Sequence, residues 1–373
     1  MVSYTICVTI ILYVALNANC KGVICMHMAD ALLYPGVGGA MWAASAGTIA
    51  YCSAKVRKEL DDRKVPLMGV LGAFIFASQM INFTIPGTGS SGHLGGGLLL
   101  AILLGTHAAF LTIASVLFVQ ALFFADGGLL ALGCNIFNLG FFPAFIAYPF
   151  IYRKITGDHP SRMRMTFAAI VAAVAGLQMG AFGVVLETVF SGISDLPFST
   201  FVLLMQPIHL AIGIVEGFVT ASVVAFIHKA RPEILEEADN CRRSGASPVR
   251  NVLIVLSLAA LLTGGIVSWF ASSNPDGLEW AVAHVTGKQE LNSPEGGIHP
   301  ALAALQEKIA FLPDYSFRKP SSAIGESKPI EEKASEQSSI DVGTSVSGII
   351  GGVLTLALAL IIGLILKKRN PTS

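Results

Sequence analysis

The chain has 373 residues, of which 53% are hydrophobic and only 13% are charged. Soluble domains carry about a quarter charged residues, so this composition excludes an ordinary soluble enzyme and indicates a membrane protein. The 24 basic and 24 acidic residues give a formal net charge of zero, which does not favour a nucleic-acid partner. The six cysteines contain no C-x-x-C pair, so we predict neither a zinc site nor a disulfide framework.

Residues 1–25 are expected to be a signal-like or over-extended N-terminal segment. The apolar run 4–19 has signal-peptide length and is shorter than the roughly 20 residues of a membrane span. Cleavage before Met26, or translation that starts at Met26, gives the same first residues of the mature protein. The alternative is an uncleaved extra helix, which leaves Met26 and His27 inside a loop.

Lys and Arg are confined to a few connections between apolar segments, and this distribution predicts the topology. By the positive-inside rule these connections are cytoplasmic, which leaves the mature N-terminus external. Residues 26–230 are therefore predicted to form a seven-helix body, 231–250 a cytoplasmic linker, and 251–370 an accessory module with two spans. The expected spans are 34–53, 67–85, two short helices within 94–126, 129–152, 165–190, 200–228, 251–271 and 345–366.

The segment 272–341 differs in composition from the body. It is rich in Pro, Ser, Glu and Lys and has few long apolar runs. It ends in SSAIGESKPIEEKASEQSS, which is typical of a flexible tether. We predict that this segment forms an external loop.

A free N-terminal Met26-His27 is a strong chelating unit. The α-amine of Met26, the deprotonated amide of His27 and its imidazole supply three nitrogens close to one plane. A fourth nitrogen completes the square geometry that Ni(II) and Cu(II) favour. The predicted topology places His93 on the external side of the body near a span end, inside PGTGSSGHLGGG. The glycines around His93 are expected to leave room for the N-terminal segment to approach.

The same stretch contains G-x-G-x-x-G, the glycine spacing of a dinucleotide-binding turn. That interpretation requires a preceding strand and an acidic residue about 20 positions further on. Here membrane spans flank the glycines and the next acidic residue is Asp126. Nucleotide binding is therefore disfavoured, although tight helix packing through small residues remains an alternative explanation for Gly95–Gly97.

Polar residues within the spans are costly in lipid and are candidates for a function. Gln79 and Asn82 precede the glycine stretch and are possible second-shell residues that hydrogen-bond the ligand imidazoles; contacts between helices are the alternative. Asp126, Asn135 and Asn138 are candidates for the same role, but we favour the alternative that they cap the short helices and satisfy interrupted backbone. His209 and Glu216 lie two helical turns apart on one face, and we favour a structural polar contact for them over a lining of the path inward.

Three stretches of the body carry a resemblance to a known family. MHMADALL, QMINFTIPGTGSSGHLGGGLLLAILLG and VQALFFADGGLLALGCNIFN resemble the nickel/cobalt substrate-binding (S) component of energy-coupling factor (ECF) transporters. The later PDGLEWA (275–281), followed by one more span, is similar to the two-span accessory protein of the nickel systems. The chain therefore resembles a fusion of the two proteins.

The resemblance implies the fold and the site. It implies an all-α polytopic membrane protein, in which the mature N-terminus folds into the core of the seven-helix bundle and a two-helix C-terminal appendage follows. The metal is then held by the amine of Met26, the amide and imidazole of His27, and the imidazole of His93. The PDGLE loop is expected at the external mouth of the site. If residues 1–25 stay attached, the amine is not free and this site cannot form.

The resemblance also implies the function. The chain would capture Ni(II), or Co(II), outside a bacterial or archaeal cytoplasmic membrane and pass it inward with a transmembrane coupling (T) subunit and cytosolic ABC-type ATPases. The sequence lacks a Walker A motif, a nucleophile elbow and H-E-x-x-H, so we expect neither enzymatic activity nor a resident cofactor. The alternatives are an ATP-independent secondary permease and cobalt uptake for cobalamin synthesis.

Overall fold

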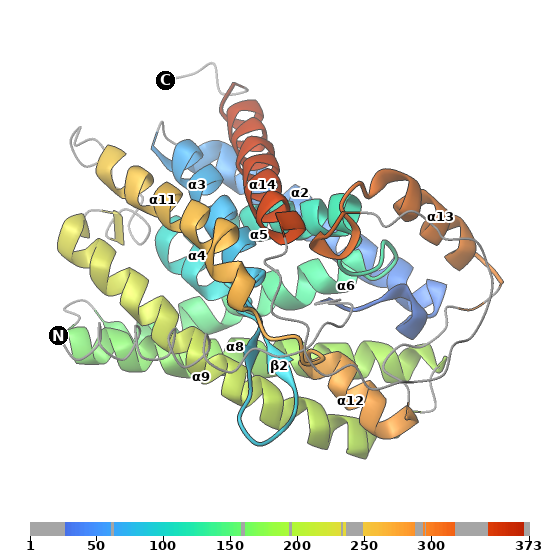
Figure 1. Ribbon diagram of the computed structural model, residues 1–373. Coiled ribbons are helices and arrows are strands. Elements are labelled where there is room, and N and C mark those ends of the chain that lie inside the picture. Colours follow the sequence, from blue (N-terminus) through green and yellow to red (C-terminus); the bar gives the residue numbers. More distant parts are fainter. Residues whose placement is uncertain are drawn as a thin grey trace.

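The computed structural model describes residues 27–60, 63–157, 161–193, 196–232, 234–235, 249–287, 294, 296–317 and 342–368. Met26, the apolar run 4–19 and the tether sequence SSAIGESKPIEEKASEQSS lie outside the described residues. The described part of the chain is almost entirely helical (Figure 1).

The N-terminal segment enters the helical body as extended chain. His27–Ala29 precede a single turn of 3-10 helix, η1 (Asp30–Leu32), and Pro35 then begins α2. A proline at this position is favourable because its missing N–H would have no partner in the first turn of a helix. The first helices and the hairpin between them are α2 (Pro35–Glu59), α3 (Lys64–Gln79), β1 (Phe83–Thr84), β2 (Ser91–Gly92), α4 (Gly97–Leu104) and α5 (Thr106–Phe124).

The break predicted within 94–126 occurs at Gly105. Its φ of 81° lies in the region that favours glycine, and it separates α4 from α5. The hairpin before α4 was not predicted: the helix expected over 67–85 ends at Gln79, and the glycine-rich stretch from Pro86 folds mostly as hairpin and irregular backbone. The irregular backbone needs protein partners because lipid offers none.

The remaining body is a set of long helices. A continuous helical stretch runs from Leu132 to Thr156, and its π-helical part contains Pro143 and Pro149, which cannot donate main-chain hydrogen bonds. Gly213 and Gly217 on one face of α9 approach the main chain of α8, so these two helices pack closely. The elements are α6 (Leu132–Ile136), η2 (Phe137–Tyr152), α7 (Arg153–Thr156), α8 (Arg162–Ser191) and α9 (Phe198–Ala230).

The appendage packs directly on the body. α14 lies against α3, where Gly69 faces Leu360 and Gly351 faces Phe76, and α11 lies beside both helices (Figure 1). The sequence predicts no helix between 272 and 341, yet α12, α13 and η4 form there. The elements of the appendage are α11 (Arg250–Gly265), η3 (Val267–Phe270), α12 (Gly277–Thr286), α13 (His299–Ile309), η4 (Pro313–Tyr315) and α14 (Val342–Lys368).

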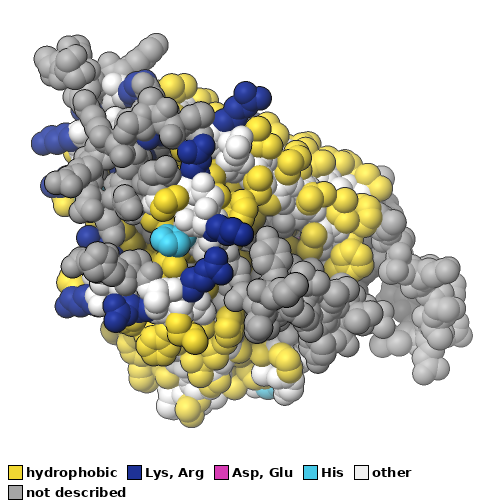
Figure 2. Space-filling model, turned by 90° about the vertical axis from the view of Figure 1, so that its left-hand side faces the viewer, with side chains coloured by type: hydrophobic (Ala, Val, Ile, Leu, Met, Phe, Trp, Pro, Cys, Tyr) yellow, Lys and Arg dark blue, Asp and Glu magenta, His cyan; other side chains and the backbone are white. Residues whose placement is uncertain are grey.

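Five of the described helical stretches are long and apolar enough to cross a membrane. α3 and α11 are apolar and shorter, and α2 continues beyond the expected end at residue 53 through Lys55 into the basic connection. Basic residues also occur in the last turns of α7 and α9, and Figure 2 shows Lys and Arg side chains gathered on one face among hydrophobic ones. The prediction of an all-α polytopic membrane protein is confirmed, with the short hairpin as the exception.

Candidate metal centre

His93 follows the second strand of the hairpin. Strands β1 and β2 pair antiparallel, with Phe83 opposite Gly92 and Thr84 opposite Ser91. The ladder therefore fixes the main chain one residue before His93. The His93 Nδ1 lies 3.2 Å from the carbonyl oxygen of its neighbour Leu94.

The backbone after His93 is held by two polar side chains from the helices. The Glu216 carboxylate on α9 accepts hydrogen bonds from the Gly95 and Gly96 amides at 2.7 and 3.2 Å. Gln79 Nε2, at the end of α3, donates to the Gly95 carbonyl oxygen at 2.9 Å. These bonds satisfy irregular backbone inside an apolar bundle and so fix the segment that carries His93.

The N-terminal segment is fixed by hydrogen bonds to the main chain of Met28, the residue after His27. The Met28 amide donates to Asn135 Oδ1 at 3.2 Å, and the Met28 carbonyl oxygen accepts from Asn135 Nδ2 at 3.3 Å. The Gly128 amide adds a second bond to the Met28 carbonyl at 3.0 Å. The Asp30 carboxylate accepts from the Ala131 amide at 2.9 Å. The turn between α5 and α6, together with α6 itself, therefore holds the N-terminal segment in place.

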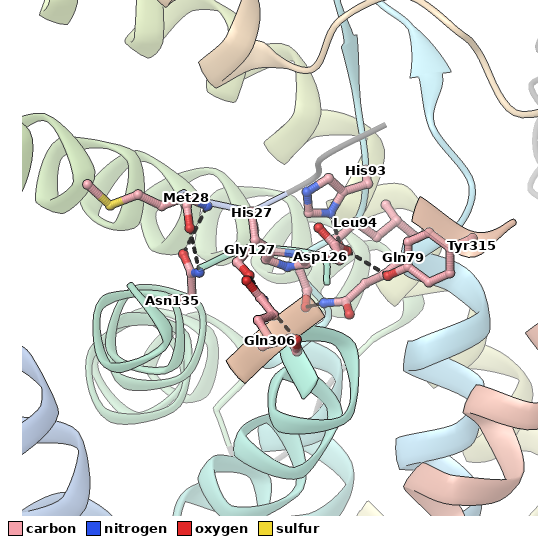
Figure 3. A network of polar contacts seen from close by, with 12 residues as sticks. His27, Met28, Gln79, His93, Leu94, Asp126, Gly127, Asn135, Gln306 and Tyr315 are labelled. Carbon is pink, nitrogen blue, oxygen red and sulfur yellow. Dashed lines mark hydrogen bonds and ion pairs between the residues drawn. The ribbon is translucent and has the colours of Figure 1, made fainter. Parts of the chain in front are cut away.

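These two segments bring the two predicted imidazole ligands together. The ring centroids of His27 and His93 are 5.1 Å apart with an interplanar angle of 51° (Figure 3). With metal–nitrogen bonds of about 2 Å, two imidazoles at adjacent positions around one ion have centroids roughly 4–5 Å apart. The Asp126 carboxylate lies beside the pair, with Oδ2 3.1 Å from His27 Nδ1.

A cavity of about 80 Å³ lies beside the two rings. Its lining combines residues of the body with Asp276, Gly277 and Leu278 of the PDGLE stretch, so body and appendage enclose it together. The donor-bearing side chains of its wall are His27, His93, Asn135, Asn138, Met28, Met205, His209 and Asp276.

The PDGLE stretch reaches the cavity because the chain before it lies along the hairpin. The Ser91 amide donates to the Pro275 carbonyl at 2.8 Å, and the Ser272 amide donates to the Asn82 carbonyl at 2.7 Å. Asp276 then caps α12 by accepting from the Glu279 amide at 2.7 Å. Burial raises the pKa of Asp276 above its ordinary value.

The glycines make room for different partners from those expected. A Cβ at Gly92 would meet Ile212 of α9, and one at Gly97 would meet the Leu139 carbonyl, so the glycines around His93 admit neighbouring helices. Room for the N-terminal segment comes from Gly127, whose Cβ would lie 2.8 Å from the His27 Cβ, and from Gly128, which faces Asp30. Among the described residues, the N-terminal segment therefore meets Gly127 and Gly128, while the glycines around His93 face neighbouring helices.

Several polar residues have other partners than the sequence suggests. Asn135 satisfies the interrupted backbone at Met28, which is the favoured role, whereas Asp126 contacts the imidazole of His27, which is the alternative. Asn138 donates to Glu187 at 2.8 Å. Among the described residues, the side-chain amide of Asn82 has no hydrogen-bond partner, so the expected bond to an imidazole is absent there.

His209 and Glu216 do not pair. His209 Nδ1 bonds to the Met205 carbonyl in its own helix at 2.8 Å, while Glu216 binds the glycine amides. On their common helical face, His209 lines the cavity, while Glu216 lies against the Gly95 and Gly96 amides. The role of Glu216 in holding the His93 segment was missed because its partners lie 120 and 121 residues away in sequence.

The fold and this arrangement define a class: a multi-pass helical membrane protein with imidazoles from two distant segments beside a cavity. The comparison with known families then identifies the chain. Residues 27–234, more than half of the chain, match the family described as the cobalt uptake substrate-specific transmembrane region, and residues 250–368 match the PDGLE domain. The chain belongs to this cobalt uptake family and carries a fused PDGLE domain, as the resemblance implied.

Named relatives and a solved structure agree with this assignment. The chain is 30% identical over 316 residues to the fused nickel transport protein NikMN of Rhodobacter capsulatus, covering 78% of this chain and 88% of the relative. It is 30% identical over 226 residues to the cobalt transport protein CbiM of Sorangium cellulosum, covering 60% and 100%. A crystal structure of a transition metal transporter is 29% identical, with a TM-score of 0.50, and covers 58% of this chain and 100% of that one. These relatives are transport proteins, which confirms the prediction of a transport component rather than an enzyme.

The Glu216→Gln variant tests how the His93 segment is held. The Glu216 carboxylate accepts from two backbone amides, whereas a glutamine has one oxygen that can accept and an NH₂ group that can only donate. One of the two hydrogen bonds to the charged group, which contributes about 1.5–3 kcal/mol, is therefore lost. We expect the Gly95 and Gly96 amides to exchange with solvent at least about 10-fold faster in hydrogen-exchange measurements. Amides in the middle of α8 are the internal control, and unchanged exchange at both glycines would contradict the assignment.

Proposed function

We propose that this chain is the membrane-embedded substrate-binding component of an ATP-driven ECF transporter that takes up nickel. The name of the NikMN relative and the fused PDGLE domain favour Ni(II) as cargo. Co(II) is the alternative cargo, supported by the CbiM relative, and cobalt uptake for cobalamin synthesis is the corresponding alternative function. The ion is the transported substrate, and no resident cofactor is proposed.

The observation that carries the proposal is the approach of His27 and His93 to within 5.1 Å beside a cavity. We propose that the ion is held by the amine of Met26, the amide nitrogen and imidazole of His27, and the imidazole of His93. Within the described ranges, no group of three or more His, Cys, Asp or Glu side chains is arranged to hold a metal. In the proposed site, main-chain nitrogens of Met26 and His27 supply the two donors beyond these imidazoles.

We propose that Gln79 and Asn82 act on the site indirectly, by supporting the segments around the ligands. Gln79 supports the His93 segment through its bond to the Gly95 carbonyl. Asn82 is buried at the start of the hairpin, where its main-chain carbonyl binds the appendage. Outer partners of this kind orient the ligands of a metal and tune its affinity.

The proposed orientation follows from the basic residues. Lys and Arg gathered on one face (Figure 2) support a cytoplasmic location of that face, with the mature N-terminus external in a bacterial or archaeal cytoplasmic membrane. We propose that this face docks the transmembrane coupling subunit, and that cytosolic ABC-type ATPases supply the energy. The proposed division of the chain is 1–25 as a signal-like or over-extended segment, 26–230 as the metal-binding body, 231–250 as linker and 251–370 as accessory module.

Replacing His93 tests the metal site. His93→Ala removes one of four proposed nitrogen donors, so we expect Ni(II) affinity of the purified full chain to fall by at least about 100-fold, more than for loss of an outer partner. Competition with a chelator of known affinity measures the change. His284→Ala, at an exposed position on α12, is the matched control and should bind like the parent. Equal affinity of the His93 variant and its parent would refute this ligand set.

Blocking the amine of Met26 tests the main-chain donors. A protein that begins at Met26 should bind Ni(II) with the absorption bands of a square-planar complex, because amine and deprotonated amide are strong-field nitrogen donors. The same protein with one additional residue before Met26, or with an acetylated amine, should lose those bands. Mass spectrometry of the mature protein establishes which N-terminus is present. Identical spectra with free and blocked amines would contradict the chelate.

Uptake into cells distinguishes the ECF transporter from an ATP-independent secondary permease. We expect nickel accumulation only when the chain is co-expressed with a coupling subunit and ATPases, because the chain has no motif for ATP hydrolysis. Accumulation of ⁶³Ni is measured with active ATPases and with ATPases that carry an inactivated Walker A lysine. Equal uptake in both strains, or uptake by the chain alone, would support the permease.

A further inference from the structure

The appendage is connected to His27 through a buried polar relay. The Tyr315 hydroxyl of η4 donates to Asp126 Oδ2 at 2.6 Å, and the same oxygen lies 3.1 Å from His27 Nδ1 (Figure 3). Tyr315, Asp126 and His27 are 5%, 2% and 6% exposed, so water does not substitute readily for any of these contacts. Because both contacts use one oxygen, the position of that oxygen depends on the appendage as well as on the body.

The position of the Tyr315 hydroxyl is set by the packing of its ring. The ring stacks on Phe124 with centroids 5.1 Å apart and an interplanar angle of 16°, and it meets Phe76 edge-on at 6.2 Å. Phe124 is the last residue of α5, two positions before Asp126. The stacking therefore fixes the hydroxyl relative to the turn that carries the carboxylate.

A second side chain of the appendage holds the same turn. Gln306 of α13 donates from Nε2 to the Gly127 carbonyl at 2.7 Å and to the Ala121 carbonyl at 2.9 Å, one on each side of Asp126. Both carbonyls belong to the C-terminal end of α5 or the turn after it, where carbonyl oxygens lack helical partners. Gln306 thus holds the turn that carries Asp126, and the N-terminal segment binds the same turn through the Gly128 amide.

We propose that Tyr315, supported by Gln306, is a positioning residue that holds the Asp126 carboxylate beside the metal ligand His27. This inference rests on the proposed metal site. Chelation by the His27 amide nitrogen and its imidazole closes a six-membered ring only through Nδ1, the atom that faces Asp126. A cation on that nitrogen takes the place of its contact with Asp126, so the carboxylate held by Tyr315 is left next to the cation, where a fixed negative charge in a buried site favours a divalent ion. Through this relay the PDGLE domain sets the affinity of the body for its ion.

The Tyr315→Phe variant tests the relay because phenylalanine keeps the stacked ring and removes only the hydroxyl. We expect Ni(II) affinity of the full chain in detergent to fall about 10- to 100-fold, as for other outer partners of metal ligands. Chelator competition with Ni(II) measures the affinity, and the absorption bands of bound Ni(II) report the ligand geometry. Tyr51→Phe, at an exposed position on α2, is the matched control and should bind like the parent.

A double-mutant cycle separates positioning from general stability. If Tyr315 acts through Asp126, Tyr315→Phe should weaken binding no further once Asp126→Asn is present, whereas independent effects would multiply. The melting temperature of the nickel-free Tyr315→Phe protein should stay close to that of the parent. Gln306→Ala provides a second variant that loosens the same turn without touching Tyr315, and it should also weaken binding.

The outcomes distinguish this inference from the proposed function. A parent protein that does not bind Ni(II) would overturn the metal site itself. A parent that binds, with parent-like affinity in both Tyr315→Phe and Gln306→Ala, would overturn the relay alone. Multiplying effects in the cycle would likewise overturn it, since Tyr315 would then act on stability rather than through Asp126.

Discussion

The site depends on one constraint: extended backbone lies inside an apolar helical bundle, where protein has to satisfy every main-chain polar group. At Met28, the side-chain oxygen of Asn135 accepts from the amide and its side-chain nitrogen donates to the carbonyl oxygen. The Gly128 amide donates a third hydrogen bond, to the same carbonyl oxygen. An unsatisfied amide in such surroundings costs roughly 2–7 kcal/mol. The backbone bonds of the next residue and the contact with Asp126 therefore help to fix the position of His27.

The same rule governs the segment that carries His93. Glu216 and Gln79 satisfy the backbone at Gly95 and Gly96, where a helix could not continue. Two irregular segments, each held by amide or carboxylate side chains from the helices, thus present their imidazoles to one another. Helical side chains contribute to the precision of the site, together with the hairpin ladder before His93 and the Gly128 amide at Met28.

The sequence predicts those parts of this molecule that depend on local properties. Apolar runs place the long helices and a break within 94–126, and the chemistry of a terminal Met-His unit makes His27, together with His93, a candidate ligand. The partners of Asp126, Asn135 and Glu216 are not predictable in this way, since each bond joins residues about 100 positions apart and leaves no periodicity. The polar composition of 272–341 does not predict α12, α13 or η4. The aromatic sequence FLPDYSF coincides with η4 alone.

The placement of Tyr315 and Asp276 on the same polypeptide as His27 has a consequence for stoichiometry. When an accessory protein is a separate molecule, the fraction of sites that it contacts depends on its concentration in the membrane and on its affinity for the body. Covalent fusion converts that encounter into an intramolecular one, whose effective concentration is set by the linker. Every copy of this chain therefore carries its own accessory contacts, and binding sites cannot outnumber the domains that shape them.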